Sequence, residues 1–394
     1  MIAGGCVSTT RTPLKQALPS VLGAAPAEAS LCYGSPAVLD LGGANTVAIA
    51  GTVGDFDGDR RPDLALATSG PDGHAVAFAM NDGSGGLRLT TGLKFPMTPT
   101  AVEAADLDHD GALDLAIAAK PGASRRGDPA VHVLLGRGKG QFIAGAVPTR
   151  VTPAGLWLAD FTGEGLTDIL ALDDGGREVE LLIGDGRGEF TPGPRSKLPG
   201  KVRAEGFTVG DFDRDKQLDL AVLYDRGMKS EAIVAVLRGE SRGGFKLGSR
   251  RAIGRKGRAL VAADFNGDGL ADLTALATAA GDGETSIAAA LLGDGALGFT
   301  AISYFGPEPV ADAIVADLDG RGGPDLLASA TVGDPLSMLP GDGRGGFGAV
   351  LKFPVGAPRT LARAADLDGD GRPELVGFGS FAAGVTILRP TACR

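Results

Sequence analysis

Short clusters of acidic residues recur along this chain at a spacing that suits the binding of a metal ion. Each cluster follows the pattern Asp-x-Asp-x-Asp-Gly-x-x-Asp, with variations, and so offers side-chain oxygens at positions 1, 3, 5 and 9. Calcium takes about six to eight oxygen ligands, and such a loop adds the backbone carbonyl of position 7 to its side-chain oxygens. Glycine at position 6 permits the sharp bend that the loop requires. The pattern therefore predicts loops that bind calcium, which we call Asp loops.

The Asp loop occurs seven times, and we number the copies as repeats one to seven in chain order. They begin at Asp55, Asp106, Asp160, Asp211, Asp264, Asp317 and Asp366, so successive copies are 49 to 54 residues apart. Each period reads as four short strands. In repeat two these are residues 101–105, 113–119 and 131–135, followed by a strand that starts at Phe142 after the Gly-rich turn 136–140. Four strands in each unit of about fifty residues predict the blades of a β-propeller.

The two ends of the chain are expected to meet in the last repeat. Repeat seven is short, because the chain ends at Arg394 soon after its third strand, 385–388. Residues 32–34 align with 346–348, so the following residues 37–41 supply the missing fourth strand. Tyr33 then takes the place of the apolar anchors that follow the other Gly-rich turns, which are Leu87, Phe142, Phe190, Phe245, Phe299 and Phe347. We expect an all-β, seven-bladed β-propeller over residues 31–394, closed by an N-terminal strand that completes the last blade.

Five of the loops carry a full set of ligands, counted with the residue whose carbonyl stands at position 7. In repeats one and two these are Asp55, Asp57, Asp59, Arg61 and Asp63, and Asp106, Asp108, Asp110, Ala112 and Asp114. In repeats four and five they are Asp211, Asp213, Asp215, Gln217 and Asp219, and Asp264, Asn266, Asp268, Leu270 and Asp272. In repeat seven they are Asp366, Asp368, Asp370, Arg372 and Glu374. Arg60 and Lys216 replace the glycine of position 6 in repeats one and four, at a modest backbone cost. We expect about five calcium sites.

The two remaining loops depart from the pattern. Repeat three offers Asp160, Thr162, Glu164 and Asp168, with fewer charges and one longer side chain, so it is a candidate sixth site or a metal-free turn. Repeat six has Arg321 at position 5, among Asp317, Asp319 and Asp325. A guanidinium among carboxylates can replace the metal ion with an internal ion pair. We therefore expect repeat six to be free of calcium.

The formal net charge of −10 argues against nucleic acid as a partner. Five calcium ions would add about ten positive charges, which would roughly cancel this value. The acidity of the sequence is thus explained mostly by metal ligands, and it does not indicate a basic partner.

The repeats resemble the FG-GAP or VCBS repeats of integrin α-subunit propellers and of many bacterial surface proteins. The resemblance rests on the Asp loops quoted above and covers about residues 31 to 393. It implies the propeller fold and calcium. It leaves the function open, because the family includes adhesion domains, lectins and non-catalytic parts of enzymes that act on polysaccharides.

The N-terminal segment and the cysteines point to a location outside the cytoplasm. Residues 1–30 are rich in Ala, Pro, Ser and Thr and read as a flexible tether. The stretch that ends in Cys6 resembles the end of a bacterial lipobox, so Cys6 is a candidate lipid anchor; a chance cysteine is the alternative. Cys32 aligns with the end of the last blade, where Cys393 lies, and we expect a disulfide between them in place of two free thiols. We expect a monomer that is secreted or held in the cell envelope, without a transmembrane segment.

Three functional hypotheses remain. We favour a non-catalytic binding or adhesion module whose ligand is a glycan or a surface component, because no catalytic motif is found. Of the three histidines, His109 lies between two calcium ligands, and His74 and His132 have no evident partners. The alternatives are an enzyme that acts on polysaccharides, or its accessory domain, and a structural spacer. Basic residues on the connections after repeats three and four form a candidate site for an anionic ligand, or merely a solvated surface. We call them the basic rim: Lys201, Arg203, Arg250, Arg251, Arg255, Lys256 and Arg258.

Overall fold

The computed structural model describes residues 32–391, except 44, 91, 121–127, 201–202, 227–230, 279–285, 306–309, 331–335, 354–360 and 379–383. Cys6, Lys201 and Cys393, as well as the tether, lie outside the described residues. Every regular element among the described residues is a β-strand, and the strands pair in antiparallel sheets. The all-β class predicted from the sequence is therefore confirmed.

Repeats one, two and three each form an antiparallel sheet whose strands follow one another along the chain. Repeat one holds β3 (Val47–Gly54), β4 (Asp63–Gly70), β5 (Gly73–Asn81), β6 (Leu87–Leu89) and β7 (Leu93–Phe95). Repeat two holds β8 (Thr98–Ala105), β9 (Asp114–Lys120), β10 (Ala130–Gly136) and β11 (Phe142–Pro148). Repeat three holds β12 (Pro153–Ala159), β13 (Asp168–Asp173), β14 (Glu178–Gly184) and β15 (Phe190–Lys197).

Repeats four and five are joined by one long strand. Repeat four begins with β16 (Ala204–Gly210), β17 (Asp219–Arg226) and β18 (Glu231–Gly239), and its fourth strand is the first part of β19 (Phe245–Ala263). The second part of β19 opens repeat five, which continues with β20 (Asp272–Thr278), β21 (Ser286–Gly293) and β22 (Phe299–Phe305). The pairing of β19 with β20 is irregular between Arg255 and Ala259, where the strand passes from one repeat to the next.

The last two repeats include both ends of the described chain. Repeat six holds β23 (Val310–Ala316), β24 (Asp325–Ala330), β25 (Leu336–Leu339) and β26 (Leu351–Phe353). Repeat seven holds β27 (Leu361–Ala365), β28 (Glu374–Phe378) and β29 (Val385–Leu388), and the N-terminal β2 (Ala37–Leu39) completes its sheet. Ala37 pairs with Ile387 in an antiparallel ladder, while β1 (Cys32–Tyr33) pairs with β30 (Pro390–Thr391). The predicted completion of the last sheet by the N-terminal strand is confirmed.

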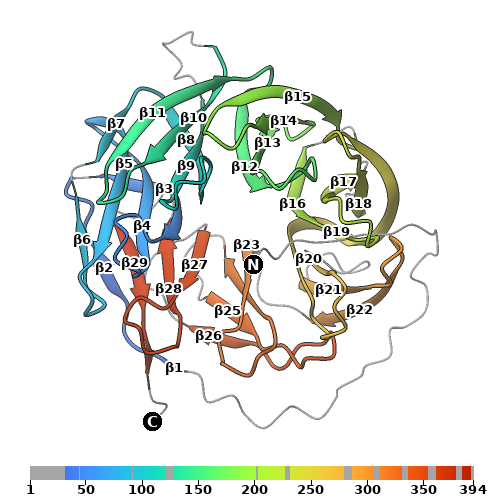
Figure 1. Ribbon diagram of the computed structural model, residues 1–394. Helices are drawn as coiled ribbons and strands as arrows, with labels where there is room; N and C mark the ends of the chain where they lie inside the picture. The colour runs from blue at the N-terminus through green and yellow to red at the C-terminus, as the bar shows by residue number, and fades with distance from the viewer. Residues whose placement is uncertain are drawn as a thin grey trace.

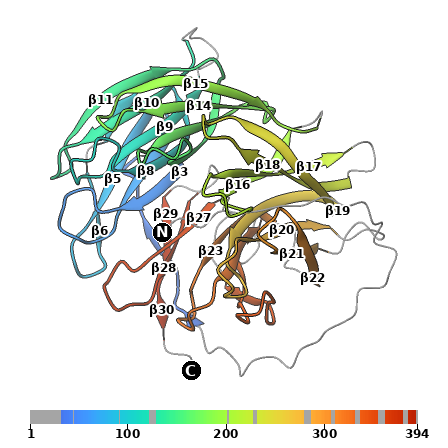
Figure 2. The same ribbon diagram turned by 45° about the vertical axis from the view of Figure 1, so that its right-hand side comes forward.

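The sheets lie around a common centre, with β12, β16, β23 and β27 near that centre and β11, β15 and β22 at the periphery (Figure 1). The first strands of neighbouring repeats contact one another: β3 contacts β8, β8 contacts β12, and β23 contacts β27. β27 in turn contacts β3, so repeat seven lies next to repeat one. Figure 2 shows the same sheets after a 45° turn.

The hydrophobic core is divided among the spaces between neighbouring sheets. One cluster, for example, combines Phe56 and Val76 of repeat one with Leu115 and Ile117 of repeat two. The anchors that follow the Gly-rich turns each pack in a different cluster of the described residues: Leu87, Phe142, Phe190, Phe245, Phe299, Phe347 and, for repeat seven, Tyr33. Small Ala, Val and Leu side chains fill most of these spaces, which lets successive sheets approach closely.

Tyr33 stabilises the junction of the two chain ends. Its ring packs edge-on against Phe353, with ring centroids 5.0 Å apart, and its hydroxyl donates to the carbonyl of Pro373 at 3.2 Å. Cys32, the residue before it, is disulfide-bonded. Its predicted partner Cys393 lies outside the described residues, so that pairing stays a prediction.

Candidate functional site

Each Asp loop connects the first and second strands of its repeat. Position 1 directly follows the first strand, and position 9 is the first residue of the second strand, as Asp55 and Asp63 are for β3 and β4. Position 9 is buried in every repeat, with at most 1% of the residue exposed: Asp63, Asp114, Asp168, Asp219, Asp272, Asp325 and Glu374. The loops therefore place one buried carboxyl at the base of a ring of exposed or half-buried ones.

The carboxyl at position 9 fastens the loop to the Gly-rich turn between the third and fourth strands. In repeat four, Asp219 accepts hydrogen bonds from the backbone N–H of Phe212 at 2.9 Å and of Gly239 at 2.8 Å. The same two bonds recur in repeats one, two, three, five and six. In repeat seven, Glu374 accepts the bond from Leu367, but its Oε1 has no partner. Position 9 is thus a structural clasp as well as a candidate metal ligand, a role that the sequence pattern alone did not reveal.

Burial raises the pKa of these clasp carboxyls. It brings the pKa of Asp219 to about 7, and those of Asp114, Asp272 and Asp325 to about 6, in spite of the backbone hydrogen bonds that lower them. Neighbouring carboxylates of the same loop raise them further. Each loop therefore gathers negative charge that a bound cation would offset.

The backbone of the loop turns twice through the left-handed region. The N–H of position 6 donates to the position 1 carboxylate in all seven repeats, for example from Arg60 to Asp55 at 2.8 Å. Arg60 and Lys216 hold positive φ angles of 70° and 68°, which confirms the backbone cost expected at position 6. Position 4 is left-handed as well, and carries glycine in five repeats but His109 and Arg214 in repeats two and four. The recurrence of glycine at position 4 was a signal that the sequence analysis did not use.

Five loops bring three carboxylates close enough to share one ion. In each, one oxygen from positions 1, 3 and 9 lies within 4.8 Å of the others; among the described residues these are the loops of repeats one, two, four, six and seven. Asp106 Oδ1, Asp211 Oδ1 and Glu374 Oε1 are buried without any hydrogen-bond partner. A buried carboxylate oxygen without a partner is costly, and a cation would satisfy it. The residues present therefore fit a cation that prefers oxygen ligands.

The loops of repeats three and five differ from these because a neutral side chain stands at position 3. In repeat three, the Thr162 hydroxyl donates to Asp168 Oδ2 at 3.2 Å and so stabilises part of the negative charge of that carboxylate. In repeat five, the Asn266 amide N–H donates to the Asp268 carboxylate at 2.9 Å, and its amide oxygen accepts the backbone N–H of Asp268 at 2.9 Å. Asparagine oxygens are ordinary calcium ligands, so repeat five stays a predicted site.

Repeat six does not stand apart as the sequence predicted. Arg321 does contact Asp319, at 3.5 Å, but guanidinium groups contact loop carboxylates in other repeats too. Arg137 bridges Asp108 and Asp110 at 2.7 Å each in repeat two. The geometry therefore gives no support to the prediction that an internal ion pair prevents calcium binding in this loop in particular.

Five of the seven basic-rim residues lie on one strand, whereas the sequence suggested a loop connection. Arg250, Arg251, Arg255, Lys256 and Arg258 all belong to β19, which runs on without a break between repeats four and five. Arg251 is partly buried and donates to the carbonyl of Phe299 at 2.6 Å, so it is engaged in the fold. Arg203, Arg250, Lys256 and Arg258 are exposed.

Two of the histidines are packing residues and not isolated surface groups. His74 Nε2 lies 3.1 Å from the hydroxyl of Thr98, across the junction of repeats one and two. His132 packs edge-on against Phe95, with ring centroids 4.7 Å apart, and burial lowers the pKa of His132.

A cluster of charged groups that the sequence analysis missed lies on the first strands. Glu103 of β8 contacts Arg363 of β27 at 3.6 Å, and Arg363 also lowers the pKa of Asp312 on β23. Burial acts in the opposite direction, raising the pKa of Glu103 and bringing that of Asp312 to about 6. Glu103 is more than two hundred positions from both Asp312 and Arg363, so the arrangement of the sheets around the common centre brings it to them.

Asp312→Asn is expected to raise the melting temperature at pH 8 and to change it little at pH 4. A carboxyl whose folded-state pKa, about 6, exceeds its ordinary value of 3.8 contributes stability below that ordinary value, and this is lost as pH rises through 6. The amide removes the ionisation and hence the loss, while Glu103 remains beside Arg363. Thermal melts across this pH range measure the effect. Asp72→Asn, in the exposed turn between β4 and β5, is the matched control. An equal response of both variants would contradict the prediction.

Comparison with known proteins supports the repeat assignment. A family model described as FG-GAP-like repeat matches residues 55–117 and 160–222, which begin at the Asp loops of repeats one and three. A search of curated proteins by sequence found no match. The crystal structure of the V. cholerae biofilm matrix protein Bap1 aligns with a TM-score of 0.50 and 13% identity over 91% of each chain, a likeness of fold alone. The chain is therefore an all-β protein that carries FG-GAP-like repeats.

Proposed function

We propose that this protein is a calcium-stabilised, seven-bladed β-propeller that acts as a non-catalytic binding or adhesion module outside the cytoplasm. The observation that carries the proposal is the repeated Asp loop with buried, unpartnered carboxylate oxygens. The sheets that surround a common centre and the pairing of β2 with β29 support the closed ring. The FG-GAP-like match and the fold shared with a biofilm matrix protein support a role at a surface.

The location rests on the cysteines and the N-terminal segment. A disulfide between Cys32 and Cys393 would join the two ends of the ring, and disulfides persist in oxidising compartments. Cys6 would serve as a lipid anchor, with a chance cysteine as the alternative, and the remainder of 1–30 would serve as a tether. No helix among the described residues has the length and apolar character needed to span a membrane. We propose a monomeric protein that is secreted or held in the cell envelope.

The calcium would be held by the ligand sets of repeats one, two, four, five and seven, with repeat three as a sixth site. When bound, it supplies charge neutralisation and shared coordination for the carboxylates of one loop. The position 9 carboxyl of each loop would keep its backbone hydrogen bonds and orient the set.

Arg321→Asp is expected to increase the number of calcium ions bound at saturation by one. The substitution supplies the missing carboxylate at position 5 and removes the guanidinium beside Asp319. Native mass spectrometry of the parent and the variant counts the ions. The carboxylates of repeat six are gathered as closely as those of other loops. If the parent and Arg321→Asp bind equal numbers of ions, and Asp317→Ala binds one fewer, the prediction that this loop is empty is contradicted.

An anionic glycan or other surface component is the proposed ligand class for the basic rim. The triple variant Arg255→Ser, Lys256→Ser and Arg258→Ser is expected to lose the part of anionic-glycan binding that the rim supplies, measured in a glycan screen, and to keep its calcium-loaded melting temperature. Binding by the parent should weaken steeply with salt, because exposed charges are screened over about 8 Å at physiological ionic strength. Arg242→Ser, which lies outside the rim, is the control. Equal binding by parent and triple variant would reduce the rim to a solvated surface, and failure of all glycans to bind would favour a structural spacer.

The carboxyls of Glu103 and Asp312 are the specific observation in favour of a polysaccharide-active enzyme. A carboxyl with a pKa raised to about 6, such as Asp312, suits a general acid. The contact of Glu103 with Arg363 and the lowering of both pKa values by this guanidinium favour an internal ion cluster instead. Release of reducing sugar from a polysaccharide by the parent, and its loss in Glu103→Gln, would establish an enzymatic activity that depends on Glu103. Equal rates in parent and variant would leave Glu103 without a catalytic role.

A further inference from the structure

A pocket of about 570 Å³ lies at the outer part of repeat one, against the Gly-rich turn of repeat two. Its volume falls in the range of small-ligand sites, which is about 300–1,000 Å³. The residues that line the pocket belong to repeats one and two and are far in sequence from the basic rim on β19. The Asp loop of repeat one forms part of the lining.

A break in the outer strand of repeat one opens this pocket. Where repeats two, three and five have one continuous fourth strand, repeat one has the short strands β6 and β7. β5 pairs with β6 at residues 79–81 and with β7 at residues 74–76, so Phe78 lies between the two ladders. Thr90 spans the break by donating its N–H and its hydroxyl to the carbonyl of Phe78, at 2.8 and 3.2 Å. The pocket therefore lies where the fourth strand of repeat one is divided into two short strands.

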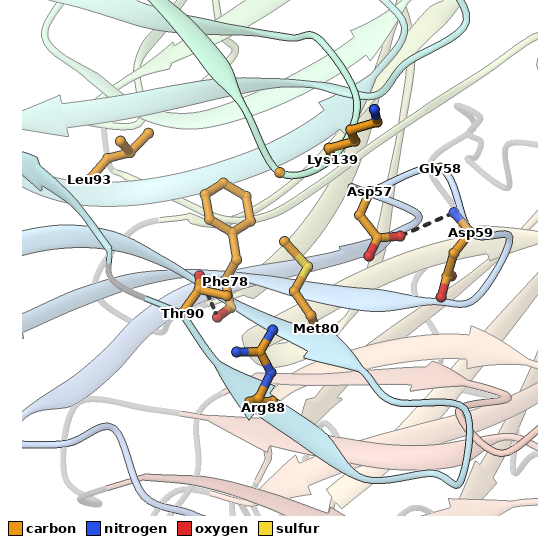
Figure 3. A pocket seen from close by; sticks show the side chains of 10 residues that line it. Asp57, Gly58, Asp59, Phe78, Met80, Arg88, Thr90, Leu93 and Lys139 are labelled. Atoms are coloured by element: carbon orange, nitrogen blue, oxygen red, sulfur yellow. Dashed lines mark hydrogen bonds between the residues drawn. The ribbon is translucent and has the colours of Figure 1, made fainter.

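The floor of the pocket is apolar and rigid. Phe78 stacks on Phe142, with ring centroids 4.6 Å apart and an angle of 9° between the rings, which fixes its orientation. Met80 lies beside it, and Leu93, at 40% exposure, forms the far edge (Figure 3). Such a floor suits the C–H face of a ring-shaped ligand.

The walls carry two cations. Figure 3 shows Arg88 and Lys139 on opposite sides of the floor formed by Phe78 and Met80. Both side chains are exposed, and neither makes an ion pair within the described parts of the chain. Lys139 also holds a left-handed φ of 53°, whereas the aligned Arg187 and Arg344 in repeats three and six do not. A strained residue of this kind persists where the surrounding structure holds it, often at a ligand site.

The Asp loop of repeat one forms the remaining side. Asp57 and Asp59 line the pocket, and the N–H groups of Lys139 and Gly140 donate to the carbonyls of Asp57 and Phe56 at 3.1 and 3.2 Å. The Gly-rich turn that carries Lys139 is thus tied to the Asp loop by backbone hydrogen bonds, which keeps the backbone of Lys139 next to Asp57. Carboxylate oxygens at this side can accept hydrogen bonds from ligand hydroxyls.

We propose that this pocket binds an acidic saccharide, whose C–H face packs on Met80 and Leu93 over the buried Phe78 while its carboxylate pairs with Arg88 and Lys139. Hydroxyl groups of the sugar would donate to the side formed by Asp57 and Asp59. The inference rests on the proposed role as a binding module and gives that role a site separate from the basic rim. An anionic lipid fits less well, because two cations and two carboxylates surround a short apolar floor.

Calorimetric titration of the calcium-loaded full chain with a hyaluronan tetrasaccharide tests the proposal, with neutral chitotetraose as the matched probe. We expect saturable binding of the acidic probe, at least tenfold weaker in the double variant Arg88→Ala and Lys139→Ala. Arg344→Ala, at the position aligned with Lys139, should bind within twofold of the parent. Absence of binding by the parent, equal binding of the neutral probe, or equal binding by the double variant would overturn the proposal.

Methyl NMR of the methionines locates the ligand independently of affinity. The Met80 methyl resonance, assigned with Met80→Leu, should shift on titration, while that of the fully buried Met338 should stay in place. Binding that leaves Met80 unshifted would place the saccharide elsewhere. If chelation of calcium lowers the melting temperature but no acidic saccharide binds, the pocket inference fails and the calcium-stabilised fold stands. If the saccharide binds but chelation leaves the melting temperature unchanged, the calcium-stabilised fold fails and the pocket inference stands.

Discussion

Excess EGTA is expected to lower the melting temperature of the calcium-loaded protein by about 10 °C or more. Each bound ion at a concentration one hundred times its dissociation constant stabilises the folded chain by about 2.7 kcal/mol, and several loops would contribute. Without the ions, gathered carboxylates such as Asp211, Asp213 and Asp219 repel one another, and the buried Asp211 Oδ1 lacks a partner. Differential scanning calorimetry of one preparation with and without EGTA measures the change.

The chelation experiment includes two controls. Magnesium added in place of calcium should restore little of the stability, because it demands near-octahedral geometry and retains its waters. Return of excess calcium should restore the original melting curve, which excludes damage by the chelator. A melting temperature that does not respond to EGTA, in a sample shown by mass spectrometry to hold calcium at the start, would contradict the calcium-stabilised fold.

Asp219→Ala is expected to destabilise the protein by about 2–5 kcal/mol even in EGTA. The substitution leaves the backbone N–H groups of Phe212 and Gly239 buried without an acceptor, and each unsatisfied donor costs about 1–3 kcal/mol. Loss of the burial cost that raises the pKa of Asp219 offsets part of this. Denaturant unfolding in EGTA measures the structural part of the effect alone.

Asp215→Ala provides the matched control in the same loop. Asp215 stands at position 5, is exposed, and does not accept the two backbone hydrogen bonds of the clasp. Its removal should therefore lower the stability of the calcium-loaded protein and have little effect in EGTA. Asp219→Asn should fall between the two, because its amide oxygen accepts one of the two hydrogen bonds. Equal responses of Asp219→Ala and Asp215→Ala in both conditions would show that position 9 serves only as a metal ligand.

The repeats, the Asp loops and the junction of the chain ends could be predicted from the sequence. An Asp loop is made by contacts over at most eight residues, such as the hydrogen bond from Phe56 to Asp63. The spacing of its residues in the sequence therefore determines its geometry. The strands of each repeat follow one another, and hairpin pairing is likewise local along the chain. The pairing of Ala37 with Ile387 joins distant residues, but the missing strand of repeat seven and the alignment of Tyr33 with the other anchors made it predictable.

The charged cluster, the pocket and the strand course of the basic rim were decided by the tertiary structure. Glu103 and Arg363 carry no motif, and they meet because the first strands of repeats two and seven face a common centre. The break between β6 and β7 has no clear signal in the sequence, yet the pocket beside it is lined by cations of two different repeats, Arg88 and Lys139. These features depend on which faces of distant strands meet around the common centre of the sheets, and the spacing of residues within one repeat contains no information about those contacts.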